Sequence, residues 1–249
     1  MKVSIILMGY NGEKYISKAL ESIKNQTYRN IELFAYDHGS QDKTMEIIKD
    51  YALHNPCNVL SYDRNPELDF KYTWARPVNE TVKLCSGDLV YLMGQDDILD
   101  KNFILNNVVE FLNNSWIELF QSDIWWFNAH KEISIRDVHP HGWRYKNREE
   151  LKRQMTQRCV VNSPSVMYSK KVLNDVGPWD GTYMNAADYE WFLRAIDKGY
   201  HIYNSEKFLG MFYGAHEKQA TTESQKYKDG CDESKLKGFY KAKWETANT

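Results

Sequence analysis

Apolar residues follow two different spacings in the first half of the chain. Short continuous apolar runs are typical of buried strands, and apolar residues at every third or fourth position are typical of helices. The first pattern predicts strands at 3–8, 31–36, 58–62 and 89–93. The second predicts helices at 13–26, 41–53 and 73–85. This alternation predicts an α/β fold with a mostly parallel, Rossmann-like central sheet flanked by helices.

After about residue 115 the spacing becomes less regular. An aromatic-rich segment at 117–127 predicts further strand structure, and 187–198 predicts one more helix. Lysines recur near the C-terminus, and the sequence contains no internal repeat or low-complexity linker. We therefore expect one domain with two halves, at 1–115 and 116–222, followed by a Lys-rich helical tail at 223–249.

Composition narrows the class of protein. The chain has 249 residues and a formal net charge of −2, so it carries no electrostatic footprint for nucleic acid. No window approaches the roughly 18 consecutive apolar residues that predict a membrane-spanning helix, and the N-terminus runs directly into a strand without a signal-type cleavage region. The cysteines are widely separated, with no metal-binding or disulfide spacing: Cys57, Cys85, Cys159 and Cys231. We expect a cytoplasmic protein with reduced thiols.

Two adjacent carboxylates, Asp96 and Asp97, follow the predicted strand at 89–93. Open α/β sheets bind ligands at the carboxyl ends of their strands. Adjacent carboxylates repel each other unless a cation or hydrogen-bond donors lie beside them, and Mg²⁺ and Mn²⁺ prefer carboxylate and phosphate oxygens. The pair therefore predicts a divalent cation that carries a phosphorylated substrate. The alternative is an acidic turn that caps the helix beginning near Asp100.

Two more polar clusters follow predicted strands. They are Gly9-Tyr10-Asn11-Gly12 and Asp37-His38-Gly39-Ser40. Because the carboxyl ends of parallel strands meet at one edge of a sheet, we expect both clusters beside the carboxylate pair. There, Tyr10 could stack on a nucleobase, and Asp37 could accept a hydrogen bond from a base N–H. The alternative is that these residues only form turns and helix caps.

The strand-end clusters belong to an ordered series of short motifs. In the first half these are Val3-Ser4-Ile5-Ile6-Leu7-Met8-Gly9-Tyr10-Asn11, Ala19-Leu20-Glu21-Ser22-Ile23, Asn25-Gln26-Thr27-Tyr28, Asp37-His38-Gly39-Ser40-Gln41-Asp42-Lys43-Thr44, Asn79, Gly87-Asp88 and Asp96-Asp97-Ile98-Leu99. In the second half they are Gly177-Pro178-Trp179-Asp180, Ala187-Asp188-Tyr189-Glu190-Trp191-Phe192-Leu193-Arg194 and Lys198-Gly199-Tyr200. Over about residues 1–216, this series resembles family 2 glycosyltransferases with the GT-A fold.

The resemblance implies a role for each motif. Residues 1–115 would bind a nucleotide sugar and 116–222 its acceptor. The nucleotide would contact Gly9, Tyr10, Asn11, Asp37, Arg76, Asn79 and Asp96. Mn²⁺ or Mg²⁺ would be held by Asp97, with Asp96 and His216 as further ligands. Asp188 would be the general base, and Trp179 would contact the acceptor.

The implied reaction transfers one sugar from a nucleoside-diphosphate sugar, of the UDP or dTDP type, to an acceptor hydroxyl with inversion. The acceptor would be a glycan or a lipid-linked molecule in the synthesis of cell-surface polysaccharide or glycoconjugate. The absence of a Gln-x-x-Arg-Trp motif favours single transfer over processive synthesis. The lysines of the tail suggest peripheral contact with an anionic membrane, although acidic residues among them also fit a solvated helix face.

Three residues depart from the family pattern. His38 replaces an acidic residue after the second strand, Gly94 stands where a third carboxylate is common, and Ala187 replaces a Glu before the general base. They keep open a second interpretation, in which the chain is a catalytically weak or inactive module that binds a sugar nucleotide or glycan. A nucleotidyltransferase is disfavoured because the loop after the first strand is not a Gly-rich, basic phosphate loop. Outside the family context, Asp188 and His216 fit a helix N-terminus and an ordinary histidine, respectively.

Overall fold

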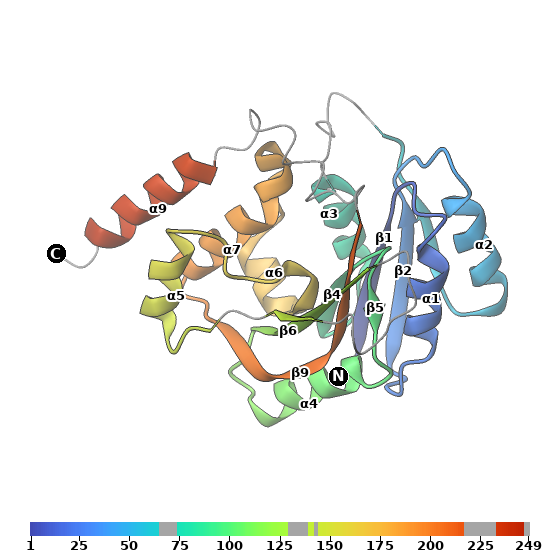
Figure 1. The fold of residues 1–249 in the computed structure, drawn as a ribbon, viewed down its shortest axis with the longest axis horizontal. Helices are drawn as coiled ribbons and strands as arrows, with labels where there is room; N and C mark the ends of the chain where they lie inside the picture. The colour runs from blue at the N-terminus through green and yellow to red at the C-terminus, as the bar shows by residue number, and fades with distance from the viewer. Residues whose placement is uncertain (65–73, 129–138, 142–143, 217–232, 247–249) are drawn as a thin grey trace.

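A computed structural model of the protein describes residues 1–64, 74–128, 139–141, 144–216 and 233–246. The first half alternates strands and helices: β1 (Val3–Gly9), α1 (Ile16–Lys24), β2 (Ile31–Asp37), α2 (Thr44–His54), β3 (Asn58–Ser61), α3 (Ala75–Leu84) and β4 (Leu89–Gly94). The four predicted strands of this half are all present (Figure 1). The helices begin two or three residues later than predicted, because polar residues before them form turns. For example, the Thr44 amide donates to the Asp42 carboxylate at 3.0 Å.

The second half completes the same sheet. Its elements are β5 (Ile98–Leu99), α4 (Phe103–Asn113), β6 (Leu119–Asn128), β7 (His139–His141), α5 (Arg148–Met155), the 3₁₀ helix η2 (Ser163–Ser165), β8 (Val166–Ser169), α6 (Lys170–Val176), the 3₁₀ helix η3 (Gly181–Ala186), α7 (Ala187–Asp197), β9 (Ile202–Ala215) and α9 (Glu233–Thr246). The strand order is β3-β2-β1-β4-β8-β6-β9-β5, with β7 paired to β6. Strands β3, β2, β1 and β4 are parallel, whereas β8 is antiparallel to both β4 and β6.

Both faces of the sheet are covered, as the α/β prediction requires. Val3, Ile5 and Leu7 alternate along β1 and pack in one cluster with apolar residues of α1, α2 and α4. Ile6 points to the opposite face and joins a cluster that includes residues of α3, α6 and α7. Successive side chains of a strand point to opposite faces. The continuous apolar run of β1 is therefore the pattern of a strand buried on both sides.

Helix α9 packs on the body of the protein rather than forming an isolated tail. Leu236, Tyr240 and Trp244 recur every four residues and are buried. The Trp244 Nε1–H donates to Asp197 Oδ1 at 3.1 Å, and Lys243 Nζ lies 2.6 Å from Asp197 Oδ2. Figure 1 shows α9 on the side of the molecule opposite α1 and α2. Of the helices within the described ranges, none is both long enough and apolar enough to cross a membrane.

Candidate active site

The three predicted strand-end clusters lie at one edge of the sheet. Gly9 at the end of β1 is in register with Asp37 at the end of β2, and Met8 is in register with Gly94 at the end of β4. The loops that follow these three strands are therefore neighbours. This is the position at which open α/β sheets bind ligands.

Reciprocal hydrogen bonds join the loops after β1 and β4. The Tyr10 N–H donates to Gln95 Oε1, and Gln95 Nε2 donates to the Tyr10 carbonyl, both at 2.7 Å. A Cβ at position 12 would lie 2.0 Å from Gln95 Oε1, so Gly12 leaves room for the Gln95 side chain in this arrangement. Gln95 was not predicted as a site residue. Gln95 directly precedes the carboxylate pair in the chain, and its hydrogen bonds hold Tyr10 beside that loop.

The loop after β2 is fixed by Asp37, as the turn-and-cap interpretation expects. The buried Asp37 carboxylate accepts from the Ser40 N–H at 3.0 Å and from the Ser40 hydroxyl. Asn11, with φ of 47°, reaches the same loop, where its Oδ1 accepts from the Gln41 N–H at 2.9 Å. Asn tolerates this left-handed backbone conformation better than most residues. The nucleotide-binding role predicted for these residues remains a prediction.

Arg64 is a candidate site residue that the sequence analysis missed. Its guanidinium carbon lies 4.3 Å from the centroid of the Tyr10 ring, and its Nη1 donates to the Tyr10 hydroxyl. Tyr10 is 39% exposed, so the ring and the cation form a surface at the edge of the sheet. The available signal was a basic residue three positions after a strand of the parallel set.

The two carboxylates of the pair have different surroundings: Asp97 is buried, and Asp96 contacts His216. Asp97 is 2% exposed, and its carboxylate accepts from the Gly214 N–H at 3.2 Å and the Gly94 N–H at 3.3 Å. Burial, followed by the charge of Asp96, raises the pKa of Asp97 well above its usual range. Asp96 Oδ2 lies 2.9 Å from His216 Nε2. The His216 ring stacks on Tyr15, with centroids 4.6 Å apart.

Gly94, one of the departures from the family pattern, has a steric reason in this fold. A Cβ at this position would lie 2.9 Å from Asp96 Oδ1 and 2.9 Å from Asp97 Oδ2. A carboxylate at position 94 would therefore collide with the pair in its present arrangement. The Gly94 N–H instead donates to Asp97.

The donor set at this edge fits a divalent cation in its chemistry. Asp96 and Asp97 are adjacent there, His216 contacts Asp96, and carboxylates are ligands that suit Mn²⁺. The buried Asp97 carboxylate accepts the two long amide hydrogen bonds given above, so a cation would offset its desolvation. In the described residues, no group of three or more His, Cys, Asp or Glu is already arranged to hold a metal ion.

Asp188 lies in the first turn of α7. Its Oδ1 accepts from the Tyr189 N–H at 2.7 Å. Burial raises the pKa of Asp188 to about 6, while the hydrogen bonds from Tyr189 and Ser163 oppose that rise. A carboxyl group with a pKa close to neutrality can accept a proton and release it again under physiological conditions. This is the property required of the predicted general base.

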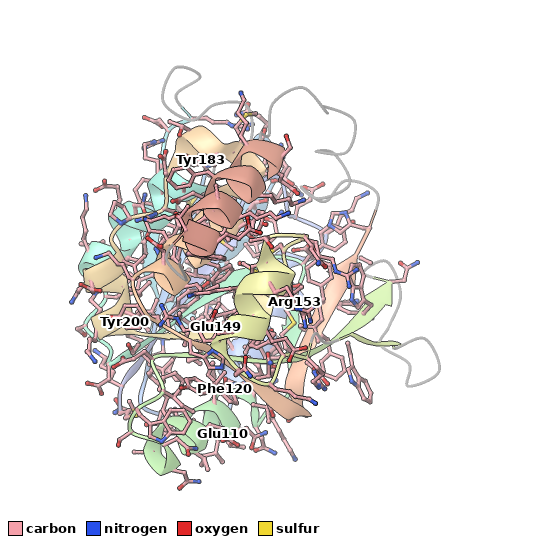
Figure 2. All side chains as sticks on the ribbon, turned by 90° about the vertical axis from the view of Figure 1, so that its left-hand side faces the viewer. Glu110, Phe120, Glu149, Arg153, Tyr183 and Tyr200 are labelled. Carbon is pink, nitrogen blue, oxygen red and sulfur yellow. The ribbon has the colours of Figure 1, made fainter. Side chains whose placement is uncertain are left out.

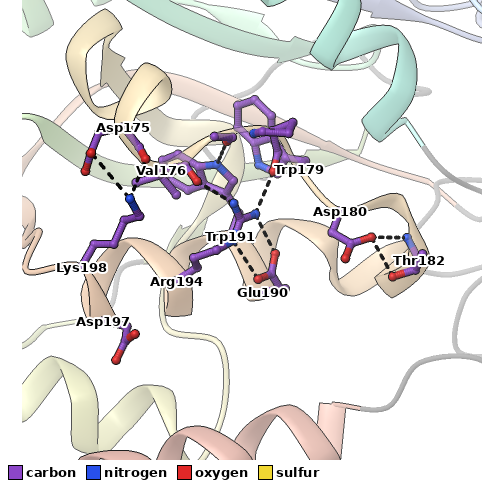
Figure 3. A network of polar contacts seen from close by, with 12 residues as sticks. Asp175, Val176, Trp179, Asp180, Thr182, Glu190, Trp191, Arg194, Asp197 and Lys198 are labelled. Atoms are coloured by element: carbon purple, nitrogen blue, oxygen red, sulfur yellow. Dashed lines mark hydrogen bonds and ion pairs between the residues drawn. The ribbon is translucent and has the colours of Figure 1, made fainter.

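A network of polar contacts fastens the segment before α7 onto that helix (Figure 3). Glu190 and Arg194 form a bidentate pair with both distances 2.9 Å. Arg194 also donates to the carbonyls of Val176 and Pro178 at 2.7 and 2.8 Å. Because this segment leads through η3 into α7, the network fixes the helix that carries Asp188.

Asn79 and Trp179 contact each other. Asn79 Nδ2 donates to the Trp179 carbonyl at 2.8 Å, and Asn79 Oδ1 accepts from the Trp179 N–H at 2.9 Å. The Trp179 side chain is 3% exposed and stacks on Trp191. In this conformation the Trp179 ring offers no exposed surface to a ligand. Its contact with an acceptor remains a prediction. Arg76, predicted beside the nucleotide, donates to the Asp63 carbonyl at 2.6 Å.

Replacing Asn79 by Ala is expected to lower the free energy of unfolding by about 1 to 3 kcal/mol, because it leaves two backbone groups of Trp179 without their partner. Urea denaturation measures the change, with the exposed Asn113→Ala as control. A nucleotide affinity equal to that of the wild type would assign Asn79 a structural role. A weakened affinity at unchanged stability would instead support the nucleotide contact implied by the sequence.

Comparison with known proteins decides the family. Residues 4–177, more than half of the chain, match the model of Glycosyl transferase family 2. The chain belongs to this family. An uncharacterized glycosyltransferase of Methanocaldococcus jannaschii is 25% identical over 83% of the chain and 69% of that protein. The dolichyl N-acetyl-α-D-glucosaminyl phosphate 3-β-D-2,3-diacetamido-2,3-dideoxy-β-D-glucuronosyltransferase of Methanococcus voltae is 35% identical over 43% of the chain and 32% of that protein.

Solved structures share the fold of this glycosyltransferase. S. aureus TarS in complex with UDP superposes with a TM-score of 0.63 at 20% identity, over 87% of this chain and 61% of that chain. The Pyrobaculum calidifontis mannosyltransferase PcManGT, solved with GDP-Man and Mn²⁺, gives a TM-score of 0.63 at 14% identity, over 87% and 58% of the two chains. The predicted GT-A fold is confirmed. The chain spans about 60% of the length of these solved chains.

Proposed function

We propose that this glycosyltransferase moves one sugar from a nucleoside-diphosphate sugar to an acceptor hydroxyl with inversion, with UDP or dTDP as the nucleotide. The acceptor is a glycan or lipid-linked molecule in the synthesis of cell-surface polysaccharide or glycoconjugate. The observation that carries the proposal is the edge of the sheet where the loops after β1, β2 and β4 lie together, with Asp96 and Asp97 in the last of these loops. Asp188, at the start of α7, supplies the second requirement, a candidate base whose pKa is raised by burial to about 6.

The donor would lie along the edge formed by the loops after β1, β2 and β4. Tyr10 and Arg64 offer a ring and a cation there, and Asp37 retains carboxylate lone pairs beyond those used by Ser40. Structures with the same fold were solved with UDP and with UDP-GlcNAc. These neighbours support a nucleotide-sugar donor, and the uridine preference is part of our proposal.

Asp96, Asp97 and His216 would hold Mn²⁺ or Mg²⁺. The cation supplies Lewis-acid stabilisation of the negative charge that develops on the diphosphate when the bond to the sugar breaks. Asp97 is suited to this position because it is buried in the loop after β4 and its carboxylate accepts long hydrogen bonds from the Gly214 and Gly94 amides. His216 would have to exchange its contact with Asp96 Oδ2 for the cation.

Asp188 would take the proton of the acceptor hydroxyl as that oxygen attacks the anomeric carbon. Attack from the face opposite the leaving diphosphate inverts the configuration at that carbon. The Tyr189 N–H orients one carboxylate oxygen of Asp188. The network around Glu190 and Arg194 holds the helix behind it. The acceptor would enter from the α7 side of the site.

The rate of transfer is expected to fall below about pH 6, because Asp188 accepts a proton only in its ionised form and its pKa is raised to about 6. Well below that pH the fall approaches about tenfold per pH unit. Turnover under saturating substrates, measured between pH 4.5 and 8.5, gives the apparent pKa. A midpoint near 4, the ordinary range of an exposed carboxyl, would argue against Asp188 as the base.

A catalytically weak or inactive binding module is the second candidate. It is favoured by His38 and Ala187, which replace acidic residues of the family pattern. Both are buried here, and the His38 N–H donates to the Gly9 carbonyl at 2.8 Å. Because Asp96, Asp97 and Asp188 are all retained, we rank the active enzyme first.

Release of nucleoside diphosphate from a panel of nucleotide sugars tests the proposal. We expect one donor to be consumed in a reaction that requires Mn²⁺ or Mg²⁺, slowly with water and faster when a suitable acceptor is added. The Asp188→Asn protein is the control for contaminating activity. Binding of a nucleotide sugar without turnover under any condition would favour the inactive module.

A further inference from the structure

A groove lies between α9 and the η3–α7 segment. Its volume is about 390 Å³, and its wall consists of Tyr183, Glu190, Lys235, Leu236, Phe239 and Tyr240. Figure 2 shows Tyr183 beside α9. The size falls within the range of small-molecule sites, which combine apolar and aromatic walls with a few polar groups. The residues assigned above to the donor, the metal and the general base do not line this groove.

Helix α9 is held along α7, so the groove has two fixed walls. At one end, Asp197 binds both Trp244 and Lys243 of α9. Toward the other end, Lys237 Nζ lies 5.9 Å from the centroid of the Tyr189 ring. Tyr240 and Leu236 are buried between these contacts. The two helices therefore run in the same direction, and the first turn of α9 lies near the start of α7.

The wall of the groove has the chemistry of a carbohydrate site. Phe239 is 61% exposed, although its neighbour Tyr240 is buried and their rings meet edge to face at 5.1 Å. An exposed ring in a groove offers an apolar surface to a ligand. On the α7 wall, Glu190 is 6% exposed, and its two oxygens, each of which accepts from Arg194, keep lone pairs for further hydrogen bonds. A sugar ring has one apolar C–H face and a rim of hydroxyls, which match these two features.

The groove is also close to the general base. Tyr183 precedes Asp188 by five residues in the continuous η3–α7 segment. Glu233, the first residue of α9, lies close enough for its charge to act on Asp188. A ligand in the groove would thus lie near the start of α9, on the α7 side from which we propose that the acceptor enters.

We propose that the groove between α9 and η3–α7 binds a sugar unit of the acceptor, one or more residues away from the reacting hydroxyl, with Phe239 as its stacking surface. The inference rests on the proposed function and deepens it, since it makes the acceptor a glycan of at least two units. It assigns α9 to acceptor recognition. Trp179, the residue predicted for that role from sequence, is buried instead.

Saturation-transfer NMR with a panel of neutral trisaccharides, such as maltotriose, cellotriose and chitotriose, tests the groove on the full chain. We expect at least one trisaccharide to bind. Phe239→Ala should weaken its binding by about tenfold or more, whereas Phe239→Tyr, which keeps a ring, should largely retain it. Trp116→Ala is the matched control, because Trp116 is 58% exposed on a distant surface near Tyr203.

Two results would overturn the inference: no trisaccharide binds the wild-type protein, or binding is equal in wild type and Phe239→Ala. Circular dichroism of each variant checks that it is folded. Titration of the same proteins with nucleoside diphosphates separates this inference from the proposed function. Loss of sugar binding in Phe239→Ala, in a protein that binds no nucleotide, would support the groove while contradicting the proposed donor.

Discussion

Replacing Asp188 by Asn is expected to abolish sugar transfer, with a loss in kcat of about 10³-fold, because the amide cannot take the proton of the acceptor hydroxyl. Affinity for the nucleotide should remain within about twofold, since Asp188 lies on α7 and the donor edge is formed by the loops after β1, β2 and β4. Single-turnover transfer and calorimetric nucleotide binding measure the two quantities. Wild-type kcat in this variant would remove Asp188 from the proton transfer.

The stability of the Asp188 variant provides an independent check. Burial raises the pKa of this carboxyl in the folded protein to about 6, above the ordinary value of 3.8. The folded state therefore binds the proton more tightly than the unfolded state. Protonation of Asp188 stabilises the folded protein below pH 3.8, and this stabilisation is lost as the pH rises through about 6. At pH 7, Asp188→Asn should raise the free energy of unfolding by about 1 to 3 kcal/mol. The exposed Asp175→Asn is the control and should leave both stability and kcat unchanged.

Replacing Asp97 by Asn is expected to weaken Mn²⁺-dependent nucleotide binding by more than about 100-fold. Loss of a residue that only orients a metal ligand costs up to about 100-fold in metal affinity, and Asp97 would be a ligand itself. An amide of the same shape preserves packing in the loop after β4 but carries no charge for the cation. Calorimetry of nucleoside diphosphate with and without Mn²⁺ measures the difference. Affinity that still responds to Mn²⁺ as in the wild type would remove Asp97 from the metal site.

The same substitution should stabilise the metal-free protein. Burial and the neighbouring Asp96 raise the pKa of Asp97, so the ionised carboxylate is destabilising at neutral pH. We expect Mn²⁺ to raise the melting temperature of the wild type but not of Asp97→Asn. The matched control for the loss of one carboxylate is Asp88→Asn. Asp88 is exposed, directly precedes β4 and accepts from the Lys2 N–H.

The first half of the fold was predictable because its strands are buried on both faces. Val3, Ile5 and Leu7 pack on one side of β1 and Ile6 on the other, which requires the continuous apolar run seen in the sequence. Polar residues then mark the points at which these strands end. Parallel pairing places those ends together, so the cluster around Asp37 and Asp97 follows from local patterns.

The second half depends on contacts that no local pattern encodes. Strand β8 has four residues, too few for a periodic signal, yet it joins β4 to β6. The contact of Asn79 with Trp179 spans 100 positions in the chain. Trp179 was expected to contact an acceptor because its motif resembles the acceptor-side part of the family, whereas stacking on Trp191 buries its side chain. The groove beside Phe239 likewise exists only because α9 packs on α7.

The residues that depart from the family pattern lie at buried or crowded positions. Gly94 leaves room for both carboxylates, and Ala187 is fully buried at the start of α7. A Glu at position 187 would bring a second carboxyl next to Asp188 in a desolvated environment, which costs free energy unless it is paired. These departures are consistent with an intact site, because the other carboxylate in the first turn of α7, Glu190, is paired with Arg194.

Calorimetric titration of the full chain with UDP, dTDP, GDP, ADP and CDP, each with and without Mn²⁺, tests the central claim most directly. The account predicts that one nucleotide, UDP or dTDP, binds tightly and that its affinity falls sharply when Mn²⁺ is removed. Failure of every nucleotide to bind a protein shown to be folded would contradict the donor site at the carboxyl ends of β1, β2 and β4.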